Sequence, residues 1–138
     1  MSKPPIRYEF VTEVPPEDIV NLYIAGDWWK ENEHNRAIIP GMIRGSFCFM
    51  VAFHNDLPIA MGRVISDGYS DGYIQDLVVK AEYRGQGIGK ELVRRLAAYC
   101  KSKQLDWIGL IAERNTQGFY EDLGFHAIDG DQLMVLKD

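Results

Sequence analysis

The segment Tyr83–Lys90, YRGQGIGK, carries glycines at three alternate positions between an apolar stretch and a helix-like stretch. Glycine loses more backbone entropy on folding than other residues, so it is favoured where φ must be positive or where another group approaches the backbone closely. A glycine turn between a strand and a helix presents free backbone N–H groups at the positive end of the helix dipole. The segment therefore predicts a site for a compact anion such as a phosphate group.

The residues on both sides of this loop predict the strand and the helix that such a site requires. Residues 72–80, GYIQDLVVK, are rich in β-branched side chains toward their end, as expected of a strand. Residues 87–103 predict a helix, because apolar side chains recur at spacings of three and four residues, at Ile88, Leu92, Val93, Leu96, Ala97 and Cys100.

Two common phosphate-binding loops fit the segment poorly. A Walker A loop requires a glycine where this chain has Arg84, and a serine or threonine where it has Glu91. A dinucleotide-binding fingerprint would use Gly85 and Gly87, but Lys90 stands where its third glycine belongs. A glycine-rich helix N-terminus that binds nothing is a third reading.

The remaining pattern predicts one mixed α/β (α+β) domain over residues 1–138, with helices packed on a single sheet. Further strands are predicted at residues 6–11, 46–54, 57–66, 106–112, 126–128 and 132–137. Further helices are predicted at residues 16–28 and 115–125, with a weaker one at 35–43 that Pro40 and Gly41 interrupt.

The distribution of charge favours a small anionic ligand over nucleic acid. The net charge is −5, but residues 80–103 hold seven basic and two acidic residues, a net of +5, which leaves −10 for the remainder. A local basic segment in an acidic chain suits a compact anion. No apolar run approaches the length of a membrane span, and the start MSKPPIRYEF has no apolar signal-peptide core, so a cytoplasmic location and no membrane partner are expected. Two cysteines are too few for a disulfide framework or a zinc site, and no metal is expected.

The pattern R-x-x-G-x-G, met by Arg84, Gly87 and Gly89, lies in the context YIQDLVVKAEYRGQGIGKELVRRL. This context, together with GFYEDLGF at residues 118–125 and the order of the elements, resembles the GCN5-related N-acetyltransferase (GNAT) superfamily over nearly the whole chain. The resemblance implies a single GNAT domain with a mostly antiparallel, six- to seven-stranded sheet and about four flanking helices.

The resemblance also implies acetyl-coenzyme A as cosubstrate. Backbone amides of the loop would bind its pyrophosphate, with the side chains of Gln86 and Ile88 facing outward. The preceding strand would pair with the pantetheine arm through an open edge. Many relatives carry an asparagine where this chain has Glu113, so Asn115 either replaces that contact or the contact is absent. The implied coenzyme-binding residues are Leu77, Val78, Val79, Arg84, Gly85, Gln86, Gly87, Ile88, Gly89, Lys90, Asn115 and Phe119.

The implied reaction moves an acetyl group directly from a thioester to a primary amine through a tetrahedral intermediate. Tyr120 is the expected acid for the leaving thiolate, because a phenol is protonated at neutral pH. The backbone N–H of Val78 or Val79 would stabilise the oxyanion. The base is open: Gln75 stands where related glucosamine-phosphate acetyltransferases have a glutamate and cannot take a proton. Asp76, Asp67 and Glu113 are the candidates, directly or through a water molecule.

The acceptor pocket would be built from residues 22–42 and 63–73. The candidates in these segments are Trp28, Trp29, Asp67 and Tyr73, although core packing would explain at least one of the tryptophans. Aromatic and acidic side chains suit an aromatic or aliphatic amine, a polyamine or a lysine side chain. The alternative is a non-catalytic acyl-CoA-binding regulatory module of the same fold. Members of the superfamily often dimerise, so a homodimer is a further expectation.

Overall fold

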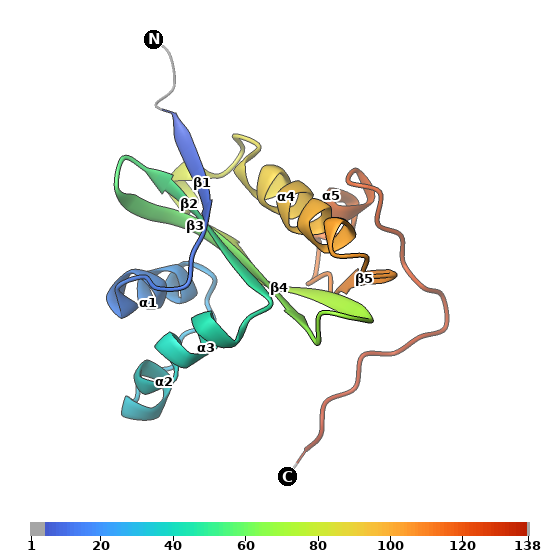
Figure 1. Ribbon diagram of the computed structural model, residues 1–138, viewed down its shortest axis with the longest axis horizontal. Helices are drawn as coiled ribbons and strands as arrows, with labels where there is room; N and C mark the ends of the chain where they lie inside the picture. The colour runs from blue at the N-terminus through green and yellow to red at the C-terminus, as the bar shows by residue number, and fades with distance from the viewer. Residues whose placement is uncertain (1–4, 138) are drawn as a thin grey trace.

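One five-stranded sheet runs through the protein in the order β1-β2-β3-β4-β5 (Figure 1). The structure is a computed structural model that describes residues 5–137. Neighbouring strands are antiparallel from β1 to β4, whereas β4 and β5 are parallel. The strands are β1 (Ile6–Phe10), β2 (Cys48–His54), β3 (Leu57–Ser66), β4 (Asp71–Val79) and β5 (Trp107–Leu110).

Within residues 5–137, five α-helices and one short 3-10 helix accompany the sheet. The first three helices lie on one side of the sheet, and α4 and α5 lie on the other (Figure 1). Proline occupies the first turn of α1 and of α3, where its missing N–H is not needed. The helices are α1 (Pro16–Ala25), α2 (Glu33–Ala37), α3 (Ile39–Gly45), η1 (Ala81–Tyr83), α4 (Ile88–Ser102) and α5 (Gln117–Glu121).

Two hydrophobic clusters hold these layers together, one on each face of the sheet. Leu92 and Leu96 of α4 are fully buried in one cluster, against Met50 and Val64 of the sheet. Ile19 and Leu22 of α1 are buried in the other, with Phe49 and Met61. Because β2 and β3 contribute to both clusters, they form the buried centre of the fold.

A bulge in β4 opens the sheet beside β5. Arg63 pairs with Gln75 and Met61 pairs with Val78, so Gly62 of β3 faces the two residues Asp76 and Leu77. Asp76 has a φ of 57°, in the left-handed region that few non-glycine residues adopt. On the other side, β5 pairs with β4 only as far as Ile74, and the two strands then separate. No pattern in the sequence marks this bulge.

The predicted fold class is confirmed, and the strand count is corrected. Five strands are present in residues 5–137, against an expected six to seven, because residues 126–128 and 132–137 pair with no other strand. The weak helix expected at 35–43 is two helices, since Pro40 starts a new first turn in α3. None of the helices in the described part of the chain has the length and apolar character of a membrane span.

Candidate active site

The glycine loop exposes the N-terminus of α4. Gly85 and Gly87 have φ values of 78° and 83°, which favour glycine because a Cβ is disfavoured there. Gly87 is the N-cap of α4 and supplies no side-chain cap. No atom lies within 4 Å of the place where a Cβ would stand at either glycine. Within residues 5–137, no protein group accepts a hydrogen bond from the N–H of Ile88, Gly89 or Lys90, so these donors are available as an anion site requires.

Side chains of the loop hold it against the rest of the molecule. The Arg84 guanidinium donates to the carbonyl of Val79 at 2.9 Å and to that of Ala25 at 3.1 Å, which ties the loop to the ends of β4 and α1. The Lys90 ammonium lies 3.6 Å from the Asp122 carboxylate. Gln86 is exposed as expected.

The expectation that Ile88 faces outward is wrong. Its side chain is 3% exposed and belongs to the core cluster under α4. Ile88 lies one turn before Leu92, so the helical repeat places both on the buried face. Gly89 has a different role from Gly85 and Gly87: it allows close packing, because a Cβ there would stand 3.3 Å from the Phe119 ring. Phe119 therefore packs directly on the first turn of α4.

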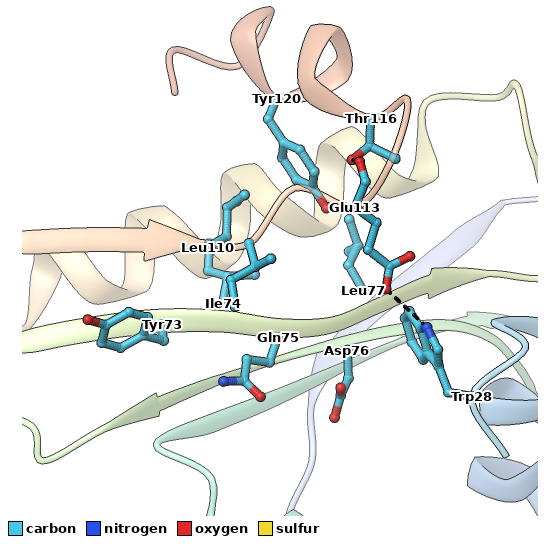
Figure 2. Close-up of a pocket in the computed structure, with 11 residues that line it drawn as sticks. Trp28, Tyr73, Ile74, Gln75, Asp76, Leu77, Leu110, Glu113, Thr116 and Tyr120 are labelled. Atoms are coloured by element: carbon cyan, nitrogen blue, oxygen red, sulfur yellow. Dashed lines mark hydrogen bonds between the residues drawn. The ribbon is translucent and has the colours of Figure 1, made fainter. Parts of the chain in front are cut away.

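A cleft of about 380 Å³ opens where β4 and β5 separate (Figure 2). It joins the two sides of the sheet: Ile74 and Leu77 point to the side of Tyr120, whereas Gln75 and Asp76 lie on the opposite side of β4 (Figure 2). The lining residues are Trp28, Tyr73, Ile74, Gln75, Asp76, Leu77, Leu110, Ile111, Glu113, Thr116 and Tyr120.

Tyr120 of α5 projects its hydroxyl into this cleft toward β4 (Figure 2). Its ring packs edge-on against Phe119 and Phe125, with centroids 4.9 and 6.1 Å away. Burial, and then the charge of Glu113, raises the pKa of Tyr120 above its usual value. The phenol is therefore protonated at neutral pH and can donate a hydrogen bond in the cleft.

Glu113 and Trp28 meet across the cleft. The indole N–H of Trp28 donates to Oε1 of Glu113 at 3.0 Å (Figure 2). This hydrogen bond joins the chain after α1 to the chain after β5, and it leaves Oε2 of Glu113 without a protein donor among the described residues.

Asp76 is held in a polar cluster on the α1 side of β4. Its Oδ2 accepts from the Tyr23 hydroxyl and from Nε of Arg63, each at 2.8 Å. Strict alternation along a strand would place Gln75 and Asp76 on opposite faces, but the bulge turns both to the same side. Burial, followed by the charge of Asp76 and its hydrogen bond, raises the pKa of Tyr23 well above its usual value.

Several of the residues predicted for the site lie outside the cleft. Trp29 is half-buried and packs against the core, its ring stacked on Tyr23 with centroids 6.2 Å apart. Asp67 caps its own turn by accepting from the N–H groups of Tyr69 and Ser70 and from the Ser70 hydroxyl, and these bonds, led by the Ser70 amide, lower the pKa of Asp67.

Of the twelve residues expected to bind the coenzyme, Leu77 alone lines the cleft, and the loop residues 84–90 lie outside its lining. The side chain of Val78 is buried beneath α1, and that of Val79 packs against the other cluster. Asn115 is exposed, with a φ of 68° in the turn before α5.

Sequence reasoning missed Tyr23 and Arg63, which orient Asp76, and Thr116 and Ile111 in the cleft lining. Tyr23 lies on the apolar face of α1. The sequence around it does not indicate that its hydroxyl binds Asp76, 53 residues away. In residues 5–137, no group of three or more histidine, cysteine and acidic side chains is arranged to hold a metal ion.

Comparison with known proteins agrees with this geometry. Residues 45–127, more than half of the chain, match the family described as acetyltransferase (GNAT) domain. The chain is 39% identical over 69 residues to GCN5-related N-acetyltransferase 2, chloroplastic, of Arabidopsis thaliana, a match to 50% of this chain and 27% of that protein. It is 37% identical over 76 residues to serotonin N-acetyltransferase 2, chloroplastic, of Oryza sativa subsp. japonica, which covers 55% of this chain and 38% of that protein. The chain thus spans well under half of the length of these two relatives.

A solved structure of a probable acetyltransferase from meticillin-resistant Staphylococcus aureus has the same fold. It superposes with a TM-score of 0.83 at 23% identity and covers 96% of this chain and 99% of that one. The family match, the shared fold and the loop at the start of α4 lead to one assignment: the chain belongs to the GNAT acetyltransferase family.

Proposed function

We propose that the protein transfers an acetyl group from acetyl-coenzyme A to a primary amine. One observation carries the proposal: the Tyr120 hydroxyl and the Glu113 carboxylate share a cleft that opens where β4 leaves β5, and Phe119, next to Tyr120, packs on Gly89 in the first turn of α4. An acid, a base and an anion site are the groups that acyl transfer from a thioester to an amine requires.

The residues present fit the coenzyme. The uncapped N-terminus of α4 suits its pyrophosphate, and the left-handed Gly85 and Gly87 allow the backbone to approach it closely. Beyond Ile74, the edge of β4 that faces β5 pairs with no strand of the described chain, so its amides and carbonyls can pair with an extended, amide-rich arm. The carbonyl of Val79 is already used by Arg84, so this pairing is expected to run from Gln75 to Val78.

Tyr120 is the residue we assign to the leaving thiolate. It is in the cleft, and its raised pKa keeps the phenol protonated at neutral pH. A protonated phenol next to the sulfur can donate a hydrogen bond or a proton as negative charge develops there.

Glu113 is the base that the geometry favours among the three candidates. Asp76 is ion-paired with Arg63 at 2.8 Å and also accepts from Tyr23, whereas the donor to Glu113 is the neutral indole of Trp28. The carboxylate of Asp67 is engaged in its own turn outside the cleft. Glu113 lines the cleft, and its Oε2 is open to a substrate or a water molecule. Asp76 is then a positioning residue that holds the bulge.

The cleft suits an amine with an aromatic or apolar body. The Tyr73 and Trp28 rings line it, and a carboxylate lies beside them for the ammonium group. The rice relative is named as a serotonin N-acetyltransferase, and serotonin is an arylalkylamine, so this class of amine is the first to test.

The test measures the free thiol that the protein releases from acetyl-coenzyme A in the presence of an arylalkylamine, a polyamine, glucosamine 6-phosphate or a lysine peptide. We expect amine-dependent release and stabilisation of the protein against heat by the coenzyme. Stabilisation without release for any amine would contradict catalysis and support the non-catalytic binding module. Neither stabilisation nor release would contradict the coenzyme site itself.

A further inference from the structure

The glycine loop, residues 84–90, makes few hydrogen bonds of its own. Within residues 5–137, no protein group accepts a hydrogen bond from the backbone N–H of Gly85, Gln86 or Gly87. Because glycine leaves the backbone free to adopt many conformations, the direction of these donors is set by the two ends of the loop. The downstream end is fixed by Ile88, whose side chain is buried in the core under α4.

The upstream end of the loop is fixed by a contact between two side chains. Tyr83, the last residue of η1, is hydrogen-bonded through its hydroxyl to Nδ1 of His54. The two rings also pack edge to face, with centroids 5.4 Å apart. Both side chains are half-buried, and the Tyr83 ring packs against the core cluster under α4. The contact therefore joins the loop to a strand end 29 residues away in the sequence.

The sheet holds His54 at a fixed position. It is the last residue of β2, and it pairs with Ile6 of β1 and with Leu57 of β3. The carbonyl of Asn55, the next residue, accepts a hydrogen bond from the Arg7 guanidinium at 3.1 Å. The β2–β3 turn and the segment between β4 and α4 lie at the same end of the sheet (Figure 1). An imidazole whose backbone is already ordered loses little further entropy when it binds a hydroxyl, so it is suited to hold a partner in place.

We propose that His54 is a positioning residue for the coenzyme, in that it acts through Tyr83 to hold the N–H groups of residues 85–90 around the pyrophosphate. This inference rests on the proposed use of acetyl-coenzyme A. A second contact supports the same end of the loop, because Arg84 donates to the carbonyl of Ala25 in α1. Neither His54 nor Tyr83 lines the cleft, so their effect on the reaction is expected through the coenzyme alone.

The first test is the affinity for coenzyme A, measured by calorimetric titration. Tyr83→Phe and His54→Phe each keep an aromatic ring and remove the hydrogen bond, and each should weaken binding by about fivefold to tenfold. The double variant should bind no more weakly than either single variant, because all three lack the same hydrogen bond.

Two further variants show whether the hydrogen bond itself is responsible. His54→Asn places an amide oxygen where Nδ1 stands, so it should keep the affinity for coenzyme A within about threefold of the wild type. Tyr99→Phe changes another half-buried tyrosine that packs against the same core cluster, near the other end of α4. It is the matched control and should bind coenzyme A like the wild type.

The choice of acyl donor separates a role at the loop from a general effect on the fold. S-acetylpantetheine has the same thioester as acetyl-coenzyme A but no pyrophosphate. Tyr83→Phe should therefore lower kcat/KM for acetyl-coenzyme A and leave kcat/KM for S-acetylpantetheine unchanged.

Equal losses with the two acyl donors would overturn the inference and leave the proposed function intact. Unchanged affinity for coenzyme A in both Tyr83→Phe and His54→Phe would have the same meaning. A wild type that binds no coenzyme A would instead contradict the proposed function, and this inference with it.

Discussion

The choice of base depends on what each carboxylate already binds. Asp76 is adjacent to Gln75 in the sequence, but its Oδ2 accepts from Tyr23 and Arg63. Glu113 comes from the chain after β5 and keeps one oxygen open in the cleft. A position next to Gln75 in the sequence therefore does not identify the base, because the bulge changes which atoms each side chain can reach.

Replacing Glu113 with Gln is expected to lower kcat/KM by about 10²-fold at pH 7, the scale of general base catalysis. The loss should shrink as the pH rises toward 10, because an alkylammonium loses its own proton there. Steady-state kinetics between pH 7 and 10 measure this effect. Glu121→Gln, an exposed change in α5 outside the cleft, is the matched control. Equal activity of Glu113→Gln and the control at pH 7 would remove Glu113 from the mechanism.

Replacing Tyr120 with Phe keeps the ring packing and removes only the hydroxyl. Turnover is expected to fall by about 10²-fold, while the thermal stabilisation by coenzyme A stays the same. The control Tyr69→Phe removes an exposed hydroxyl outside the cleft. Single-turnover rates are the decisive measurement, because they report the chemical step, and an unchanged rate would contradict the acid role.

At the scale of elements, the loop before α4 depends on backbone conformation. Gly85 and Gly87 are left-handed, and a Cβ at either one would meet no atom. A substitution there would act through φ alone, without a steric clash. The loop can therefore be tested separately from the packing of α4 and α5.

Gly87→Ala is expected to cost about 1–2 kcal/mol of unfolding free energy, because an L-residue is strained at a φ of 83°. It should also weaken coenzyme A binding, since relief of the strain moves the first N–H groups of α4. Gly41→Ala is the control: this glycine is helical with no atom near its Cβ position, so the change should be neutral or stabilising by up to about 1 kcal/mol. Denaturant unfolding and calorimetric titration test both expectations, and equal effects of the two variants would contradict them.

The polar cluster that joins α1 to β4 predicts a dependence of stability on alkaline pH. The pKa of Tyr23 is raised by burial and by Asp76, so between about pH 10 and the native pKa the folded state retains a proton that the unfolded state has lost. The contribution of this pKa difference to the free energy of unfolding is complete below about pH 10. It decreases as the pH rises, by at most about 1.4 kcal/mol per pH unit.

Tyr23→Phe is therefore expected to be less stable than the wild type at pH 8, by about 1 kcal/mol for the lost hydrogen bond. Its unfolding free energy should fall less steeply between pH 10 and 11. Urea unfolding at each pH measures both slopes, and parallel slopes would show that Tyr23 does not carry the effect.

At the scale of the whole molecule, local patterns predicted the elements and missed how distant ones meet. The apolar repeat after Gly87 identified α4, and the β2–β3 hairpin follows from alternation around Asn55. The bulge at Asp76, the Tyr23 contact and the burial of Trp29 depend on packing between distant segments. The apolar character of residues 132–137 indicated a strand, but in the structure these residues are exposed and form no strand.

The arrangement of the whole sheet explains the position of the candidate site. The sheet is continuous until β4 and β5 separate, and the cleft at that point receives residues from both sides of the sheet. The basic segment around α4 lies on one side and the acidic remainder includes Glu113 and Asp76, so the charges are suited to an anionic donor and a cationic acceptor.

The most direct test of acetyl transfer at this cleft compares the wild type with the double variant Glu113→Gln/Tyr120→Phe. The measurement is the amount of free thiol and of acetylated arylalkylamine that each protein forms from acetyl-coenzyme A. The wild type should form the two products in equal amounts, and the double variant should bind the coenzyme but form both at least 10²-fold more slowly. Equal rates in the two proteins, or coenzyme binding without any acetylated amine, would contradict the assignment.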